Sequence, residues 1–214
     1  LNIILNRDRT GLNNNNKPTR LYTALRANPE FRLRFADRVN KHFYNGGALM
    51  TDKVLSRWLT RRDQVWRAVV AESARWGDFR RDVLQGSGSR DQYDLFHRNQ
   101  HYVAYQEWLL NTYFPRRRNI FLAQLARREL VAELSPPALE PHGGTIPAGG
   151  GGLEVGISVD AGTIYFTADG SDPRLEGGAV SPAASRYSDP LTLAGTTPLK
   201  ARVLRRGNWS SLTE

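Results

Sequence analysis

Hydrophobic residues in the first 135 positions recur at helical spacing. One set falls at i, i+4, i+8 and i+12, which places it on a single helix face: Phe31, Phe35, Val39 and Phe43. Asn28-Pro29-Glu30 is a start signal, because Asn caps a helix, Pro fits its first position and an acid complements its dipole. Asn45-Gly46-Gly47 is a stop signal. The pattern predicts a helix between these two signals.

The rest of this region predicts further helices joined by polar loops. We expect a short helix over 20–26, a long one over 51–76, a turn or two over 78–84, and helices over 91–113 and 116–128. Pro115 should interrupt the last two, because proline lacks the N–H that a helix interior needs. The expected non-helical segments are a strand over 1–5, a turn-rich loop over 6–18 and a flexible loop over 85–89.

Beyond residue 135 the hydrophobic period becomes two, as in half-buried strands. The alternating apolar positions are Leu153, Val155, Ile157 and Val159, then Ile164, Phe166 and Ala168, then Leu191 and Leu193, and finally Leu199, Ala201 and Val203. Turn sequences such as Asp169-Gly170-Ser171-Asp172-Pro173 separate them. Four or five short strands of this kind predict a small antiparallel β-sandwich.

Composition supports two domains. Residues 1–135 hold 24 Lys and Arg against 13 Asp and Glu, whereas residues 136–214 hold 6 against 8 and most of the Gly and Pro. We therefore predict an α+β multidomain chain with a helical domain at 1–135, a Pro- and Gly-rich linker with a first edge at 136–152, and an immunoglobulin-like sandwich at 153–214. The four glycines at 149–152 fit a hinge better than a phosphate-binding loop, because the chain has no Gly-Lys-Ser/Thr sequence of the kind such a loop needs.

The net charge of +9 comes mostly from 26 Arg, against only 4 Lys. An Arg-rich helical face can bind an acidic partner, but long Arg side chains also simply cover helix flanks. No basic run is long enough for a nucleic-acid-binding tail, so we do not expect nucleic acid as a partner. The absence of cysteine excludes disulfides and thiol chemistry. The sequence contains no run of 18 apolar residues, so we predict no membrane-spanning helix.

No complete catalytic constellation is visible. His97 and His101 have the i, i+4 spacing of two metal ligands on one helix face, but no acidic third ligand accompanies them. Asp169 and Asp172 flank Gly-Ser and can chelate Ca²⁺, although the same side chains also stabilise a turn. Trp209 can stack on a sugar ring or pack in the sandwich core.

The block Glu72-Ser-Ala-Arg75-Trp76-Gly77-Asp78 contains the remaining binding candidates. Glu72 and Arg75 are three residues apart, close enough to pair on a helix. In a functional interpretation Arg75 and Asp78 line a substrate groove with Trp76 beside them. In a structural interpretation the block locks the end of a helix against the next segment.

Several blocks, in the same order, resemble the C-terminal portion of CotH (spore coat protein H) kinase-like proteins. They are LYTALRANPEFRLRFADR at 21–38, NGGAL at 45–49, ESARWGD at 72–78 and YFPR at 113–116. Residues 139–214 are similar to the chitobiase/β-hexosaminidase C-terminal module, an immunoglobulin-like sandwich of bacterial surface and secreted proteins, through YFTADGSDP at 165–173.

The kinase resemblance implies an atypical protein-kinase-like fold whose full-length members use ATP and a divalent metal. Where that family has an acidic metal motif with Trp, this chain has LNRDRT at 5–10. Asp8 is then either a metal-site residue or a turn residue. We expect ATP and metal only for a full-length parent, and no cofactor for this chain.

Together these features predict a catalytically silent C-terminal fragment of a secreted or surface bacterial protein, an interpretation that the abrupt apolar start without Met favours. The helices would complete a kinase-like lobe, and the sandwich would be a spacer or adhesion module facing a surface protein or polysaccharide. One alternative is a carbohydrate-binding accessory module with exposed coplanar aromatics. The other is an anion- or nucleic-acid-binding helical domain whose affinity falls with salt.

Overall fold

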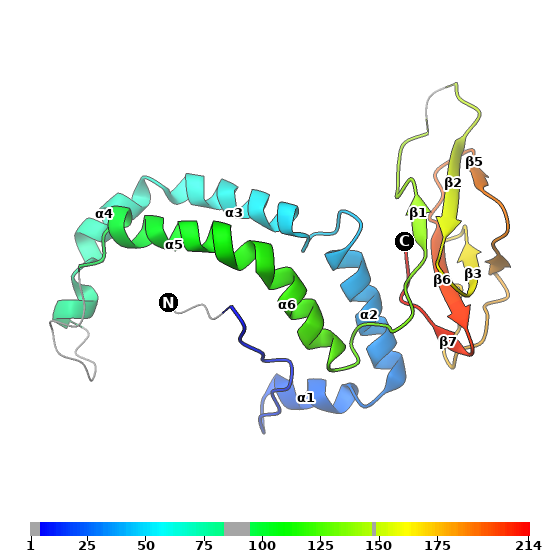
Figure 1. The fold of residues 1–214 in the computed structure, drawn as a ribbon, viewed down its shortest axis with the longest axis horizontal. Helices are drawn as coiled ribbons and strands as arrows, with labels where there is room; N and C mark the ends of the chain where they lie inside the picture. Colours follow the sequence, from blue (N-terminus) through cyan, green and yellow to red (C-terminus); the bar gives the residue numbers. More distant parts are fainter. Residues whose placement is uncertain (1–4, 84–94, 147–148) are drawn as a thin grey trace. The chain divides into compact units, whose positions relative to one another are not determined.

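The computed structural model describes residues 5–83, 95–146 and 149–214. Most of the strand expected over 1–5 and the whole loop expected over 85–89 lie outside these residues. The helices are α1 (Pro18–Leu25), α2 (Pro29–Phe43), α3 (Thr51–Val65), α4 (Ala68–Trp76), α5 (Val103–Trp108) and α6 (Phe114–Ala126) (Figure 1). Short π-helical turns are η1 (Phe79–Val83), η3 (Arg98–Tyr102) and η4 (Leu109–Tyr113).

Helix α2 begins as its sequence predicts. The Asn28 side chain accepts a hydrogen bond from the Glu30 backbone N–H at 2.8 Å, and Pro29 is the first helical residue. The apolar stripe also lies as expected, with Val39 and Phe43 buried beside Leu125 and Leu130. Partly buried aromatic rings of α1, α2 and α6 pack around this cluster, namely Tyr22, Phe31, Phe35 and Phe121.

The expectation that Pro115 interrupts the helical path is wrong. Residue 115 is the second residue of α6, and η4 leads directly into that helix. A π-helical turn shifts the hydrogen-bonding pattern from i→i−4 to i→i−5, which relieves the position where the proline has no N–H to donate. The long helix expected over 51–76 is instead divided at residues 66–67 into α3 and α4, where the Trp66 N–H bonds three residues back to Asp63.

The C-terminal region forms two antiparallel sheets. One has the order β1 (Ala138–Glu140), β2 (Leu153–Ser158), β5 (Leu191–Leu193). The other has the order β4 (Ser185–Arg186), β3 (Thr163–Thr167), β6 (Lys200–Arg205), β7 (Asn208–Trp209). Their inward residues form one cluster, consisting of Leu139, Val155, Ile157, Ile164, Leu199, Ala201 and Val203. The α+β class and the small antiparallel sandwich are thus confirmed.

Contacts group the chain into two compact units. One consists of residues 1–6 and 48–120, which we call the helical unit, and the other of residues 7–47 and 121–214, which we call the sandwich unit. The boundary predicted near residue 135 follows composition, whereas the contacts place α1 and α2 with the sandwich. Among the described residues, no helix is long and apolar enough to cross a membrane.

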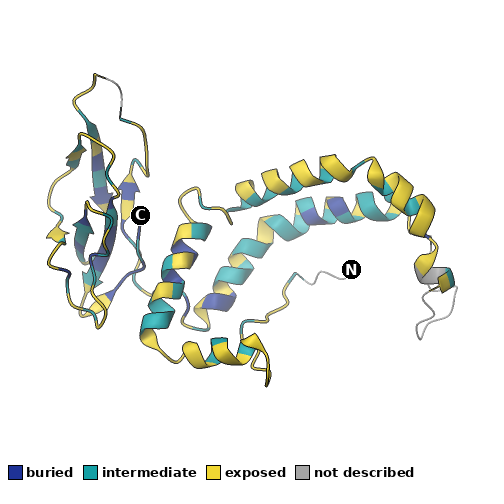
Figure 2. Ribbon diagram, turned by 180° about the vertical axis from the view of Figure 1, so that it is seen from behind, coloured by how far each residue is buried: buried dark blue, intermediate teal, exposed yellow. Residues whose placement is uncertain are grey.

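Burial differs between the two units. In the sandwich unit, both apolar clusters contain fully enclosed side chains, such as Leu130 and Val203 at 0% exposure. Among the described apolar residues of the helical unit, only Leu109 is buried, and α3 and α4 have no buried residue. In Figure 2, α3 is drawn in the colours of exposed and intermediate residues along its length.

Candidate functional site

The predicted block at the end of α4 is partly brought together. Glu72 and Trp76 line an aromatic cleft of about 1180 Å³ in the helical unit, together with Phe96 and Tyr102. Trp76 is 51% exposed, and the Arg75 guanidinium lies 5.0 Å from the centre of its ring. Arg75 and Asp78 do not line the cleft. A substrate role for these residues stays a prediction.

The same block also contacts the segment before η3. The Gly77 carbonyl accepts a hydrogen bond from the Phe96 N–H at 2.9 Å. A Cβ at position 77 would come within 2.8 Å of the Phe96 carbonyl oxygen, so only glycine permits this approach. The geometry therefore has the features of the structural interpretation, in which the block holds the end of α4 against a neighbouring segment.

His97 and His101 contact each other and the neighbouring Phe96. His101 Nδ1 accepts a hydrogen bond from the His97 backbone N–H at 3.0 Å, and its ring stacks on Phe96 with 4.6 Å between the ring centres. Across the described residues, no group of three or more His, Asp or Glu is arranged to hold a metal ion.

Asp8, the weak catalytic candidate, is exposed and forms a local turn. It accepts hydrogen bonds from the Thr10 hydroxyl at 2.6 Å and the Thr10 N–H at 2.8 Å. The hydroxyl hydrogen bond is the main cause of its lowered pKa. This is the geometry of an Asp that stabilises its own turn.

The two calcium candidates of the sandwich have different surroundings. Asp169 accepts from the Ser171 hydroxyl at 2.6 Å and the Ser171 N–H at 2.9 Å, and these bonds lower its pKa. Asp172 accepts from the Arg174 N–H at 3.0 Å and from two guanidinium nitrogens of Arg202 at 2.7 Å each. The first carboxylate stabilises a turn, while the second reaches across to strand β6.

Arg202 is the centre of a buried ion-pair network. Its side chain is 2% exposed and donates two hydrogen bonds to Asp37 of α2, at 2.7 and 2.8 Å, besides those to Asp172. Burial disfavours its charge, but the two carboxylates outweigh burial and raise the pKa of Arg202. Burial likewise tends to raise the pKa of Asp172, but the hydrogen bond and charge of Arg202 lower it overall.

Three further ion pairs join α2 to the sandwich. Along one face of α2, charges of alternating sign each meet an opposite charge: Glu30 with Arg174, Arg34 with Glu176, Asp37 with Arg202, and Lys41 with Glu214. Glu30 and Arg174 form a bidentate pair at 2.6 and 2.8 Å, which lowers the pKa of Glu30 to about 2. We call this row of four pairs the charge zipper.

The pairs of the charge zipper differ in how much each contributes to stability. Arg34 and Glu176 are 66% and 78% exposed, and such surface pairs contribute about 0–1 kcal/mol. Removing one partner of a buried pair typically costs about 3–5 kcal/mol, because a buried charge is left uncompensated. Arg202 is therefore the side chain on which docking of α2 depends most.

Trp209 lies inside the sandwich unit and is 8% exposed. Its Nε1 donates to the Gly178 carbonyl at 2.8 Å, and its ring lies 5.8 Å from that of Tyr165. The structure places its ring in a packed position, without the exposed face that sugar stacking needs. Its role as a binding residue stays a prediction.

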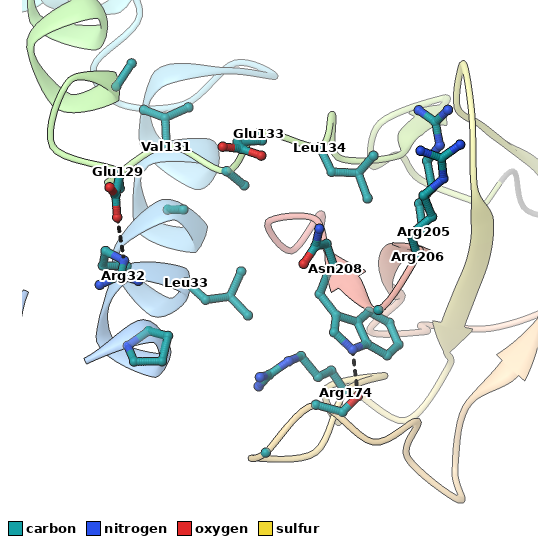
Figure 3. Close-up of a pocket in the computed structure, with 18 residues that line it drawn as sticks. Arg32, Leu33, Glu129, Val131, Glu133, Leu134, Arg174, Arg205, Arg206 and Asn208 are labelled. Atoms are coloured by element: carbon teal, nitrogen blue, oxygen red, sulfur yellow. Dashed lines mark hydrogen bonds and ion pairs between the residues drawn. The ribbon is translucent and has the colours of Figure 1, made fainter. Parts of the chain in front are cut away.

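A cleft of about 690 Å³ lies beside Trp209, between α2 and the sandwich (Figure 3). One side is formed by α2 and the segment after α6, with an Arg32–Glu129 ion pair at 3.4 Å. Its other residues labelled in Figure 3 are Leu33, Val131 and Glu133, while Leu134 lines the cleft and packs against the sandwich cluster. The sandwich side contributes Arg174, Arg205, Arg206 and Asn208. The cleft is therefore apolar in part and flanked by charges of both signs.

The sequence interpretation missed the charge zipper and this cleft. A signal for the zipper was present, because Glu30, Arg34, Asp37 and Lys41 follow helical spacing with alternating sign. Such a stripe commonly faces solvent. Its partners come from 142 to 173 residues away in the chain, so its role required the tertiary structure.

One comparison with known proteins identifies the sandwich. Residues 155–213 match the family model described as Fn3 associated, a span that includes Asp172, Arg202 and Trp209. No curated protein and no solved structure matches the chain. Residues 155–213 are a fibronectin-III-associated, immunoglobulin-like β module.

Proposed function

We propose that this chain is a non-catalytic accessory part of a secreted or surface bacterial protein of the CotH kinase-like type. Its β module acts as a rigidly mounted spacer or adhesion module. Fibronectin-III-associated modules fit an extracellular setting, which supports this assignment. The single observation on which the proposal rests is the position of Arg202, which binds Asp37 and Asp172 at once.

Arg202 supports a rigid mounting because of where its partners come from. Asp37 belongs to α2, within the block at 21–38 that resembles the kinase-like family, and Asp172 belongs to the β module. A buried guanidinium that binds one carboxylate from each of two elements fixes the position of α2 relative to the β module. Any shift between them would leave a buried charge without its partner. The module is then an extension of α2.

Exposed aromatic residues of the helical unit support its role as part of a larger lobe. Trp76 is 51% exposed, Phe96 45% and Phe79 37%. Large apolar patches on a protein surface commonly mark contact with other polypeptide. In this proposal the remainder of a kinase-like lobe covers the cleft between α4 and α5.

Spin labels test the rigid mounting. The chain has no cysteine, so Arg38→Cys on α2 and Ser185→Cys on β4 give two unique labelling sites. We expect one narrow distance distribution by pulsed electron resonance, and a broader one when Arg202→Met is added. A broad distribution in the doubly labelled protein with Arg202 intact would contradict the mounting.

Catalytic silence has a separate test. Melting of the chain with ATP and Mg²⁺, or with ATP and Mn²⁺, should match melting without nucleotide, because no phosphate cradle is visible in the sequence. A nucleotide-dependent rise in melting temperature would refute this part of the proposal.

A further inference from the structure

The hairpin between β6 and β7 has an unusual residue at its tip. Arg205 pairs with Asn208, so Arg206 and Gly207 form a two-residue turn. Both have positive φ, 51° and 81°, as a type I′ turn requires. Asn, Asp and Gly are favoured at such positions, and other residues cost roughly 1–2 kcal/mol. An arginine held in this conformation points to a role beyond forming the turn.

Arg205 and Arg206 are exposed cations on the rim of the cleft in Figure 3. In the part of the chain that the structure describes, neither side chain makes a hydrogen bond or an ion pair. Arg32 and Arg174, which also line the cleft, are engaged with Glu129 and Glu30. The hairpin therefore offers two guanidinium groups that are not neutralised within the described residues.

The opposite side of the cleft offers different chemistry. Glu133 is exposed and has no partner among the described residues, and Leu33 and Val131 supply apolar surface on the same side. The volume of about 690 Å³ lies within the range of ligand-binding pockets. A matching ligand has an anionic group on one side, groups that donate hydrogen bonds on the other, and apolar ring surface between them.

We infer that this cleft binds an acidic polysaccharide of the uronate type. Arg205 and Arg206 take the carboxylate, because guanidinium groups form paired hydrogen bonds with it. Glu133 accepts hydrogen bonds from sugar hydroxyls, and Asn208 both donates and accepts. Tripolyphosphate fits less well, since it has neither sugar hydroxyls to donate to Glu133 nor apolar ring surface for the cleft between the charges. This inference rests on the proposed adhesion role of the module and names its ligand class.

Arg206→Asn tests the site without a cost in folding. Asn is favoured at this turn position, so the variant should melt at the same or a higher temperature. Calorimetric titration with a short oligogalacturonate should show binding to the wild type, and affinity at least about tenfold weaker in the variant, the effect of losing one charged hydrogen bond. Arg186→Asn on strand β4 is the matched control, because it removes an exposed arginine that does not line the cleft.

Three further arms make the result decisive. The methyl ester of the same oligosaccharide lacks the charge and should bind at least about tenfold more weakly. Glu133→Gln should weaken binding of the oligogalacturonate, because the carboxylate that accepts from the sugar hydroxyls is lost. If binding were only a general attraction of the anion to the basic protein, removing this negative charge would strengthen it. Equal losses in Arg206→Asn and Arg186→Asn, equal binding of tripolyphosphate, or no binding of the oligogalacturonate would overturn the inference. None of these outcomes affects the spin-label result, so failure of the ligand assignment is separable from failure of the rigid mounting.

Discussion

The sandwich unit and the helical unit use similar residues in different ways. Both are rich in aromatic and arginine side chains. In the sandwich unit the apolar residues form two buried clusters, and Arg202 is enclosed between two carboxylates. In the helical unit the described apolar side chains stay partly exposed except for Leu109, and arginines lie over indole rings, as Arg98 does 4.7 Å from Trp66. Composition alone therefore does not reveal which unit has its own core.

Arg202→Met is expected to have the largest effect on this contrast. It leaves Asp37 and Asp172 without their cation, and we expect the sandwich unit to lose about 3–5 kcal/mol. Hydrogen exchange of β3 and β6 amides measures this loss for the unit alone. Arg186→Met, an exposed arginine of the same unit, should change exchange little. Equal exchange in the wild type and Arg202→Met would show that the network contributes no net stability.

Leu130→Ala comes next, because it empties a site that is 0% exposed between α2 and α6. Truncation of a buried leucine costs about 2–5 kcal/mol through lost burial and the cavity left behind. Exchange of α2 amides should rise accordingly. A cost below 1 kcal/mol, well under that range, would mean that the cluster around Leu130 does not hold α2 in place.

Acid should weaken the sandwich unit through Glu30. Its folded pKa of about 2 is below the ordinary 4.5, so the stability it contributes is fully present above pH 4.5 and is lost as pH falls toward 2. Asp172, whose pKa is also lowered, acts in the same direction. Glu30→Gln should lower the melting temperature at pH 7 and flatten its fall through this window. A parallel fall in variant and wild type would exclude a contribution from the Glu30–Arg174 pair.

Val70→Ala should have the smallest effect. Val70 lies on α4 and is 51% exposed, and substitutions at such positions usually change stability by about 0.5 kcal/mol or less. Exchange of α4 amides is the measurement. A loss above about 2 kcal/mol would mean that α4 has a packed core, and the contrast between the units would fail.

Local sequence signals predicted the elements well. The Asn28 cap, the stripe through Val39 and Phe43, and the strand alternation of Val155 and Ile157 each depend on near neighbours in the chain. The π-helical turn before Pro115 was not foreseen, because it is a variant of helix with no distinct apolar period. The cleft beside Trp209 was not foreseen either, since its two sides come from segments far apart in sequence.

The amino-acid sequence by itself determined the α+β class, the helix caps and the alternating strands, because each follows from steric preferences and periodicity within a few residues. Only the tertiary structure decided that α1 and α2 belong with the sandwich. It also decided that Asp172 holds an arginine and that Arg205 and Arg206 border a cleft. The reason is that ion pairs and clefts depend on distances in space, and Asp37 and Arg202 meet at 2.7 Å although 165 residues separate them.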